Sequence, residues 1–249
     1  MVEVSVVIPT LKPREEIEPV EYLRRGAFAD YEVVVRDEYP VTRARNAGIE
    51  RANAEKIVFL DDDSRPRPEY LSRAAATLDE EAAVAGRTVH PRDDLFARNF
   101  TDHYEFWVGD EPAYVDLFWG CNMAVRREVF EDVGYWDEGM GWGHEEKELA
   151  HRIRQKYRIY YDPEMVVDHP YADSIPGYWR KQYKLETQTP YYWDKVGIPR
   201  DEQVRLTVSK ALRPGNYVGR TVPCTVTRAG ATVAKSAGRI RGLLARPKA

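Results

Sequence analysis

Three consecutive carboxylates, Asp61, Asp62 and Asp63, follow a short apolar run at residues 57–60. An apolar run of this length without glycine or proline predicts a strand that is buried on both faces. Acids at the carboxyl end of such a strand lie where open α/β sheets bind their ligands. Three adjacent carboxylates repel one another, and a divalent cation relieves that repulsion. Taken alone, the stretch fits both a cation-binding site and a solvated acidic turn.

The elements that would position these acids alternate between strands and helices in the first part of the chain. The expected order is a strand at 4–8, a helix at 14–25 interrupted by Pro19, a strand at 31–35, a helix at 41–54 capped by Thr42, a strand at 56–60, a helix at 68–80 and a strand at 82–89. This alternation predicts a mainly parallel sheet with helices on its faces.

Three of these strands end in polar or turn residues. The first ends at Pro9 and Thr10, the second just before Asp37, and the third at the acids 61–63. Parallel strands bring their carboxyl ends to one edge of the sheet, so we expect a crevice there with a nucleotide as its natural ligand. No G-x-G-x-x-G or G-x-x-x-x-G-K-[ST] motif follows a strand, which argues against an ordinary dinucleotide or P-loop site.

The periodicity is less regular beyond residue 91. The expected elements there are a helix or flap at 93–110, strands at 114–119 and 122–125, a helix at 126–133, a glycine-rich loop at 139–143, a helix at 144–157 and short strands at 158–161 and 165–167. The last of these strands leads directly to Asp168 and His169.

Four segments, taken in order, resemble family 2 glycosyltransferases. They are VSVVIPT at residues 4–10, RARNAGIERA at 43–52, VFLDDD at 58–63 and the long segment from WGCNMAVRREVF to MVVDH at 119–169. The resemblance covers about residues 2–169 and implies a GT-A fold, a nucleotide-diphospho-sugar donor and inversion at the anomeric carbon. Cleavage of a sugar–diphosphate bond leaves charge on the departing phosphate, which a divalent metal and basic groups stabilise.

The resemblance assigns the three acids to the family's D-x-D motif. It implies that Asp63 is a direct metal ligand and that Asp61 contacts the metal, its bound water or the ribose of the donor. Asp62 is then a supporting or structural member of the donor-binding group. His169 matches a family histidine that binds the metal or the pyrophosphate, with Asp168 as a weaker second candidate. Carboxylate and phosphate oxygens suit both Mg²⁺ and Mn²⁺, so we expect one of these cations as the cofactor.

Further donor contacts follow from the resemblance. The implied donor-binding residues are Pro9, Thr10, Asp37, Arg45, Gly120 and Asn122, together with Asp61 and Asp62. Because Arg43 lies two positions from Arg45 on a helix, only one of the two should face the crevice. The chain has Arg-Asp-Glu at 36–38 where many members have Asp-Asp-Gly-Ser, so the identity of the base is not carried over. UDP is the family's commonest carrier, and GDP and dTDP remain open.

The acceptor side is implied by the segment GMGWGHEEKEL at 139–149. Glu146 matches the family's general base, which takes the proton of the acceptor hydroxyl. The family usually has Asp at this position, and the longer reach of Glu leaves Glu145 open as the base. Acids at the start of a helix also interact favourably with its dipole without any catalytic role. Trp142, as an aromatic platform, and His144 are the implied acceptor-binding residues.

The charge of the chain is unevenly distributed. The 249 residues carry a net charge of −4, but residues 201–249 have a net charge of +8 and residues 1–200 a net charge of −12. The acidic body argues against a nucleic-acid partner. Residues 226–246 are basic, with apolar residues at helical spacing, which is typical of a helix on a membrane surface. The segment also contains three glycines, which weaken a helix, so a loose tail and a helix that covers the protein body are the alternatives.

We expect residues 1–170 to form the GT-A domain, with a nucleotide-binding half at about 1–90 and an acceptor-binding half at about 91–170. Residues 171–200 should form an aromatic and basic helical segment, and 201–249 a basic helical extension. Two distant cysteines and the lack of an apolar run long enough to span a bilayer predict a cytoplasmic protein. The basic C-terminus adds the hypothesis of peripheral attachment to the cytosolic face of a membrane.

The predicted function is metal-dependent, inverting transfer of a sugar from a nucleotide-diphosphate donor to a hydroxyl of a lipid-linked or glycan acceptor. Processive members carry Gln-x-x-Arg-Trp where this chain has Gln182-Tyr-Lys-Leu, which favours single transfer. Two alternatives remain open. A haloacid-dehalogenase-like phosphatase also has a strand that ends in D-x-D, but it requires Thr or Val where Arg65 stands. The other alternative is a non-catalytic protein of the same fold that binds sugar nucleotides.

Overall fold

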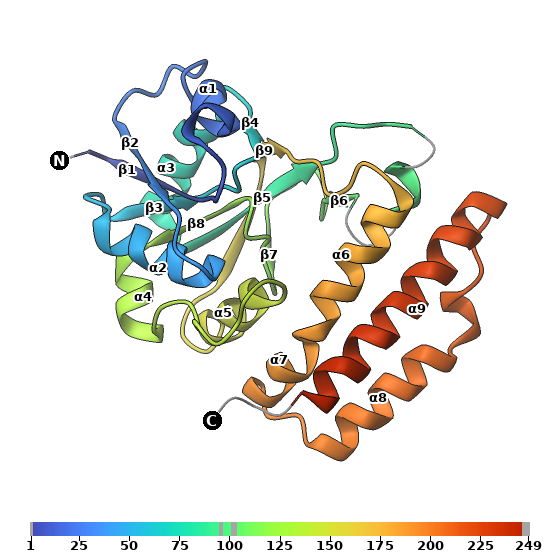
Figure 1. Cartoon of the computed structure of the whole chain (residues 1–249). Helices are drawn as coiled ribbons and strands as arrows, with labels where there is room; N and C mark the ends of the chain where they lie inside the picture. Colours follow the sequence, from blue (N-terminus) through green and yellow to red (C-terminus); the bar gives the residue numbers. More distant parts are fainter. Residues whose placement is uncertain (1, 95–96, 101–103, 246–249) are drawn as a thin grey trace. The chain divides into compact units, whose positions relative to one another are not determined.

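The computed structural model describes residues 2–94, 97–100 and 104–245, which form two compact units (Figure 1). The first, the sheet unit, comprises Met1–Pro91, Glu105–Gly139 and Leu149–Pro170. The second, the helical unit, comprises Arg92–Tyr104, Met140–Glu148 and Tyr171–Ala249. Each unit therefore combines segments that are distant in the sequence.

Among the described residues, nine strands form one sheet in the sheet unit. They are β1 Val4–Pro9, β2 Tyr31–Arg36, β3 Lys56–Phe59, β4 Arg65–Pro66, β5 Ala83–Val89, β6 Glu105–Phe106, β7 Ala113–Val115, β8 Met123–Arg126 and β9 Ile159–Asp168. The main order is β2-β1-β3-β8-β5-β9-β4, with β6 on β5 and β7 on β9.

The long strands of the sheet share one direction. β1 pairs in parallel with β2 and β3, β5 pairs in parallel with β9, and β8 is antiparallel to both β3 and β5. Because β8 is reversed relative to both neighbours, β2, β1, β3, β5 and β9 all point the same way. The prediction of a mainly parallel sheet is confirmed.

Helices pack on both faces of this sheet (Figure 1). α1 (Glu18–Leu23) and α3 (Tyr70–Glu80) contribute to one buried cluster, and α2 (Val41–Arg51) and α4 (Arg127–Val133) contribute to the other. The second half of α5 (Glu145–Ile153) joins the cluster of α2 and α4. Two covered faces explain why strands β1 and β3 are apolar at successive positions.

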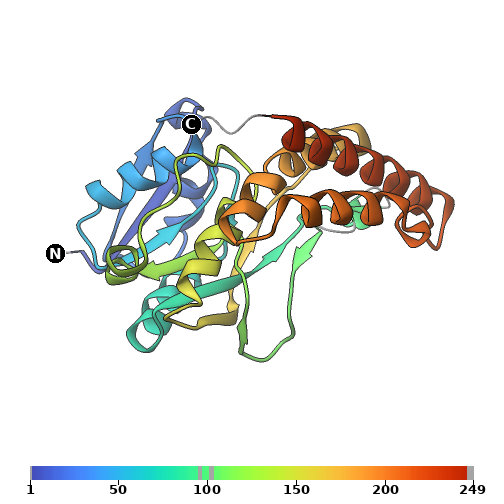
Figure 2. The ribbon, with the colours of Figure 1, turned by 90° about the horizontal axis from the view of Figure 1, so that it is seen from below.

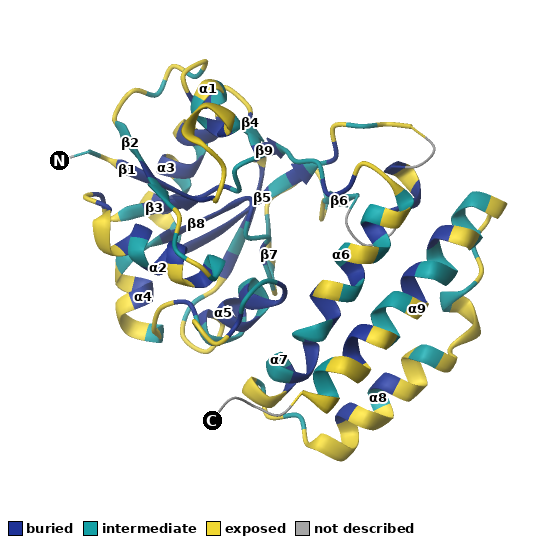
Figure 3. Cartoon of the chain, in the orientation of Figure 1, coloured by how far each residue is buried: buried dark blue, intermediate teal, exposed yellow. Residues whose placement is uncertain are grey.

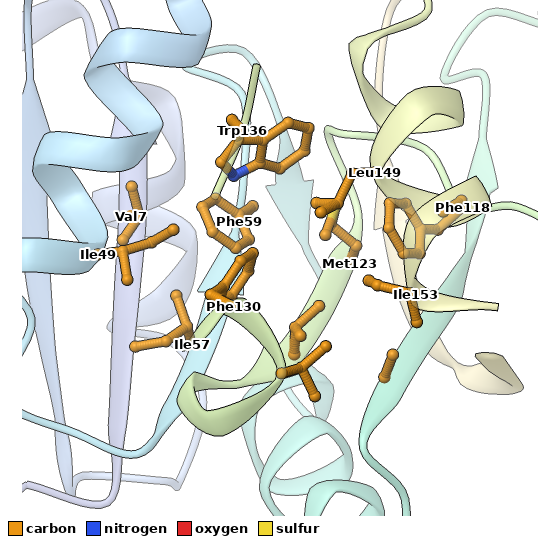
Figure 4. Packing of buried hydrophobic residues seen from close by; sticks show 14 of the residues in the cluster. Val7, Ile49, Ile57, Phe59, Phe118, Met123, Phe130, Trp136, Leu149 and Ile153 are labelled. Carbon is orange, nitrogen blue, oxygen red and sulfur yellow. The ribbon is translucent and has the colours of Figure 1, made fainter. Parts of the chain in front are cut away.

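The side chains of β3 alternate between the two clusters. Ile57 and Phe59 lie in one cluster and Val58 lies in the other, and all three are fully buried. Figure 4 shows Phe59 between Phe130 and Trp136, whose ring centroids lie 5.9 and 5.5 Å from its own. Burial of each side chain of this size stabilises the fold by about 1.5–3 kcal/mol. Core packing therefore fixes the position of β3, the strand that leads into the acids.

Two helix starts differ from expectation. Pro19 lies in the first turn of α1, where a missing N–H leaves no hydrogen bond unmade, so it begins the helix and does not interrupt it. α2 begins at Val41 after the extended residue Pro40, and no side chain caps it. The predicted capping role of Thr42 is therefore wrong, and Thr42 is a buried residue of the first turn.

Two strand predictions are also corrected. The two short strands expected at 158–161 and 165–167 are one continuous strand, β9, which contains an irregularity in its pairing with β5 between Gly86 and Arg87. Pro163, which has no N–H to donate, lies in this irregular part of β9. Of the strand expected at 114–119, only Ala113–Val115 is formed. The helix or flap expected at 93–110 falls partly outside the described residues.

The helical unit is built from α6 Ile175–Thr187, α7 Thr189–Lys195, α8 Arg200–Leu212 and α9 Val222–Leu244, with short 3₁₀ turns at Ala97–Asn99 and Pro214–Asn216. α9 runs beside both α6 and α8 (Figures 1 and 2). Among the residues with assigned positions, no helix is long and apolar enough to cross a membrane.

α9 packs tightly against α6 because two of its glycines lack side chains. A Cβ added at Gly238 would lie 2.5 Å from the carbonyl oxygen of Tyr183, and one at Gly242 would lie 2.4 Å from that of Thr187. Glycine reduces intrinsic helix stability, but here it allows the backbones to approach closely. The basic C-terminal segment is therefore an integral helix of its unit and not a loose tail.

Candidate functional site

The three acids and His169 lie together at the carboxyl edge of the sheet because the short strand β4 pairs with β9. The turn 61–64 follows β3 and leads into β4, which pairs with the end of β9: Arg65 lies opposite Asp168 and Pro66 opposite Val167. This pairing carries the acidic turn across the sheet to the residue that follows β9. His169 thus meets the acids although β9 is not adjacent to β3 in the sheet.

Two of the three acids approach the imidazole ring. His169 Nε2 lies 3.1 Å from Asp63 Oδ1 and 3.7 Å from Asp61 Oδ2. The thiol of Cys121 joins them, because one ligand atom from each of Asp61, Cys121 and His169 lies within 4.8 Å of the other two. Sequence reasoning missed Cys121, although it stands between Gly120 and Asn122 in a segment already singled out.

The ionisation of His169 depends on these neighbours. Burial acts to lower its pKa, but Cys121 and Asp63, by charge and by hydrogen bonding, raise that pKa well above the ordinary value. The ring thus sits in an environment that favours positive charge. Carboxylates, an imidazole and a thiol together are donors that divalent cations accept, so the residues present fit a metal ion.

Asp62 points to a different set of partners. It accepts a hydrogen bond from the hydroxyl of Thr10 and forms an ion pair with Lys12 at 2.7 Å. Burial lowers the pKa of Lys12, but its hydrogen bond to Asp62 and the nearby acids raise that pKa overall. Asp62 therefore joins the ends of β1 and β3, while the outer two acids face His169.

Arg45 lies beneath Asp61. Its Nη2 is 3.2 Å from Asp61 Oδ1, and its guanidinium carbon is 4.6 Å from the centre of the Trp136 ring. A Cβ at Gly120 would come within 2.7 Å of the same Nη2, so glycine is required for the guanidinium to fit. Arg43, by contrast, is exposed and pairs with Glu138, in agreement with the expectation that only one of the two arginines faces the crevice.

The remaining implied donor contacts divide into two groups. Thr10 and Asp37 line one cavity of about 610 Å³, which extends along β2 from Glu32 to Asp37. Pro9 is buried at the end of β1. Asn122 is fully buried, and its amide donates to the carbonyl oxygens of Arg87 and Met165. Asn122 thus belongs to the packing of the sheet unit, and its predicted contact with the donor stays a prediction.

The acidic pair Glu145 and Glu146 belongs to the helical unit, at the start of α5. Glu145 is 5% exposed and accepts a hydrogen bond of 2.5 Å from the backbone N–H of Gly143, so it is committed to its own turn. Glu146 is partly exposed. Burial thus distinguishes Glu146, the acid preferred from the sequence, from Glu145, and the role of Glu146 as the base stays a prediction.

The turn before this pair has an unusual backbone. Gly143 and His144 have φ of 104° and 67°, in the left-handed region that residues other than glycine rarely adopt. A Cβ at Gly143 would also lie 2.9 Å from the Cα of Leu185. Trp142 is partly buried beneath the amine of Lys184, which lies 4.9 Å from its ring centre.

A chain of buried hydrogen bonds holds His144. The Thr189 hydroxyl donates to Glu186 at 2.6 Å and lies 2.8 Å from His144 Nε2. Because that hydroxyl has one proton, already given to Glu186, His144 Nε2 must be the donor. Arg239 of α9 donates two bonds of 2.6 Å to the same Glu186. The His144 ring therefore supports the turn, and its predicted contact with an acceptor stays a prediction.

The comparison with known families gives the identification. Residues 18–134 match the family described as glycosyl transferase family 2. The chain carries a family 2 glycosyltransferase domain. Within this transferase the matched range includes the acids 61–63, Arg45 and Cys121, and it ends before Glu145 and His169.

Curated relatives of the transferase are distant. It is 22% identical over 219 residues to the glycosyltransferase AglE of Haloferax volcanii, a match that covers 84% of this chain and 70% of that protein. It is 27% identical over 132 residues to the glucosyl-dolichyl phosphate glucuronosyltransferase of the same organism, covering 48% and 42% of the two chains. Over 110 residues it is 30% identical to the dTDP-rhamnosyl transferase RfbF of Shigella flexneri, covering 39% and 37%.

Solved structures show the same fold. S. aureus TarS matches with a TM-score of 0.55 and 16% identity over 88% of this chain and 46% of that one. A structure of its residues 1–349 matches with a TM-score of 0.52 and 14% identity over 96% and 90%. The predicted GT-A fold is confirmed, and the protein is a glycosyltransferase enzyme that uses a nucleotide-sugar donor.

Proposed function

We propose that the transferase moves one sugar, with inversion, from a nucleotide-diphosphate donor to a hydroxyl acceptor and depends on Mn²⁺ or Mg²⁺. The observation that carries this proposal is the convergence of Asp61, Asp63 and His169, with Arg45 beside Asp61, at the carboxyl edge of the sheet. A departing nucleoside diphosphate gains negative charge, and such charge is stabilised by positive groups fixed in advance.

Asp61, Asp63 and His169 would hold the cation, with Cys121 as a further ligand. When bound, the cation would stabilise the charge on the leaving diphosphate. Arg45 donates a hydrogen bond of 3.2 Å to Asp61, and this bond would hold the carboxylate in one orientation. UDP is the first donor carrier to test, followed by GDP and dTDP.

Glu146 is the proposed general base. It takes the proton of the acceptor hydroxyl as the hydroxyl oxygen attacks the anomeric carbon, and the electron pair of the broken sugar–oxygen bond leaves with the diphosphate. The partial exposure of Glu146 supports this role, whereas Glu145 is buried and bonded to Gly143. His144 is hydrogen-bonded to Thr189 and stabilises the turn that precedes Glu146.

Release of nucleoside diphosphate from UDP-, GDP- and dTDP-sugars in Mn²⁺ tests the catalytic proposal. Glu146→Gln should lower kcat by about 10²–10⁴-fold and leave the Kd of the donor unchanged, because the variant removes only the base. The kcat of the matched control Glu145→Gln should stay within about tenfold of the wild-type value. Full activity of Glu146→Gln would contradict the assignment.

The same assay separates the alternatives. Cleavage of phosphate esters that depends on Asp61 but not on Glu146 would favour a haloacid-dehalogenase-like phosphatase. Donor binding without turnover for every donor would favour the non-catalytic reading.

We further propose that the acceptor is carried by a lipid or a glycan at a membrane surface. One relative is named a glucosyl-dolichyl phosphate glucuronosyltransferase, so that protein acts on a lipid-linked sugar. In this chain, α9 exposes five apolar side chains, those of Val222, Val226, Val233, Ile240 and Leu244. Figure 3 shows exposed positions of α9 in yellow. Apolar helix faces flanked by basic residues bind anionic lipid surfaces.

Deletion of α9 cannot test this proposal, because α9 is packed on α6. The double variant Val233→Asp/Ile240→Asp changes only exposed positions, and we expect it to lose sedimentation with vesicles that contain phosphatidylglycerol. Ala27→Asp/Ala29→Asp, at exposed positions of the sheet unit, adds the same charge and should keep it. Equal sedimentation of the two double variants would contradict the membrane role of α9.

A further inference from the structure

The helical unit contains a basic cavity that the proposed transfer does not use. It lies along α8, the 3₁₀ turn 214–216 and α9, with a volume of about 120 Å³. The side chains that matter for its chemistry are those of Lys210, Asn216, Arg228, Lys235 and Arg239. One water needs only about 10–15 Å³ on a comparable measure, so the cavity has room for a group with several oxygen atoms.

Positive charge dominates the lining. Four cationic side chains and no carboxylate are among its described lining residues. Arg239 is 7% exposed, and its charge is balanced by Glu186, to which it donates two hydrogen bonds. Arg228 uses one N–H to bond the carbonyl oxygen of Gly215 at 3.0 Å. A guanidinium has five N–H groups, so Arg228 retains donors for a ligand.

Lys210 lies close enough to other cations of the helical unit to be repelled by them. Partial burial lowers the pKa of Lys210, the charge of Arg239 lowers it further, Glu186 opposes this, and Lys147 and Lys235 again lower it. An arrangement that makes an ammonium less stable than in water is unfavourable by itself. A bound anion would remove the cost, because it supplies the negative charge that the lining lacks.

The main packing of α9 does not depend on the cations of the cavity other than Arg239. α9 is already held by its contacts with α6 and by the pair of Arg239 with Glu186. Lys210 lies near the charges of Arg239, Lys147 and Lys235, and its Nζ is 5.9 Å from the centre of the Trp193 ring. Asn216 also lines the cavity; its amide donates one N–H to the carbonyl oxygen of Lys210 and has a second N–H for a phosphate oxygen. The hydroxyl of Ser236 donates its proton to the carbonyl oxygen of Thr232 and adds no donor for a ligand.

We propose that this basic cavity binds a phosphate group, with Arg228 as the planar two-bond donor and Lys210 and Lys235 as point charges. Arginine and lysine together are the usual protein ligands of phosphate. The phosphate belongs either to a soluble phosphate or diphosphate or to the head group of a lipid. The site goes beyond the proposed sugar transfer, since no residue of the acidic site takes part in it.

Calorimetric titration of the full chain with inorganic phosphate and pyrophosphate tests the site. EDTA is present throughout, so that cation-dependent binding at the acidic site does not contribute. Wild type should bind with a stoichiometry of one. Lys210→Gln/Lys235→Gln should weaken that binding at least tenfold. The control Arg205→Gln/Arg213→Gln removes two exposed charges of the same unit outside the cavity and should stay within twofold.

Circular dichroism and thermal melting check that each variant is folded. If the double variant does not fold, Lys235→Gln alone should weaken binding at least threefold. No saturable binding to wild type, or an equal loss in the control variant, overturns the proposal. Because these titrations contain neither a sugar donor nor a metal, their failure leaves the transferase activity untouched, and loss of transferase activity leaves them untouched.

Vesicles distinguish the two sources of phosphate. Phosphatidylcholine vesicles that contain phosphatidate, a phosphate monoester, are sedimented with the protein in the presence and absence of pyrophosphate. Sedimentation that falls with pyrophosphate and in the Lys210→Gln/Lys235→Gln variant assigns the site to a lipid head group. If neither pyrophosphate nor the double substitution changes sedimentation, while inorganic phosphate or pyrophosphate still binds in the titrations, the site is assigned to a soluble phosphate.

Discussion

Substitution of Gly120 tests whether the close packing of Arg45 against residue 120 maintains the hydrogen bond between Arg45 and Asp61. In Gly120→Ala the new Cβ would lie 2.7 Å from Arg45 Nη2 and 3.2 Å from its Cζ. Ordinary van der Waals contact begins at about 3.4 Å, so the guanidinium must move by roughly 0.7 Å. Arg45 is 2% exposed and lies against the Trp136 ring, so it has little room to do so. We expect its 3.2 Å hydrogen bond to Asp61 to break.

The expected cost follows from that bond. A hydrogen bond to a charged group contributes about 1.5–3 kcal/mol, and the Asp61 side chain is 34% exposed, so solvent screens part of the loss. Gly120→Ala should therefore lower the free energy of unfolding by about 1–2 kcal/mol. Arg45→Met removes the same bond and also the contact with Trp136, and it should cost about 2–4 kcal/mol.

Urea unfolding of a double-mutant cycle measures this coupling. In the Arg45→Met background the guanidinium is gone, so adding Gly120→Ala should cost less than about 0.5 kcal/mol. Gly215→Ala is the matched control, because nothing lies within 4 Å of its added Cβ, and it should change stability by less than about 0.5 kcal/mol. A cost of Gly120→Ala that is the same in both backgrounds would refute the reasoning.

Three further predictions concern single contacts. Asp62→Ala should lower the free energy of unfolding by about 1–2 kcal/mol in urea titrations, since it removes the acceptor of Thr10 and the partner of Lys12. Cys121→Ser should abolish the near-ultraviolet thiolate-to-cobalt absorption of the Co²⁺ complex, while Cys224→Ser keeps it; a band that persists in Cys121→Ser would exclude that ligand. Thr189→Val should lower the free energy of unfolding by about 1–3 kcal/mol, because buried His144 and Glu186 both lose their hydrogen-bond partner. It should also lower kcat without changing the Kd of the donor. An unchanged kcat would show that this hydroxyl does not hold the turn before Glu146.

The sequence predicted the carboxyl edge of the sheet well, because strand periodicity and the positions of polar residues are local signals. β1, β2 and β3 form where expected, and the contact between Thr10 and Asp62 confirms that their ends converge. The fold class followed from the ordered resemblance to family 2 glycosyltransferases, and solved structures confirm it.

The contacts between distant segments could not be derived from local patterns. His169 meets Asp63 because the two-residue strand β4 pairs with β9, and a strand so short has no periodicity to read. The role of Cys121 depends on the same convergence. The glycines of α9 suggested a weak helix, but their effect is decided by α6, whose backbone they approach.

Burial adds information about Glu145, Glu146 and Asn122 that their spacing in the sequence does not carry. Glu145 and Glu146 are chemically identical neighbours, and only the structure shows that Glu145 is buried and bonded to its own turn. Asn122 was implied as a donor contact by its position in the motif, yet it is enclosed by β5 and β9. The motif identifies the segment, and the structure adds how far each of its side chains is buried.

The central claim is that the outer acids at the end of β3 bind a nucleoside diphosphate through a divalent cation. Calorimetric titration of UDP, GDP and dTDP into wild type and Asp63→Asn, in Mn²⁺ and in EDTA, tests it most directly. We predict that at least one nucleotide binds wild type at least tenfold more tightly in Mn²⁺, and that Asp63→Asn loses this difference while it stays folded. Equal affinity in Mn²⁺ and EDTA, or a full Mn²⁺ effect in Asp63→Asn, would contradict the claim.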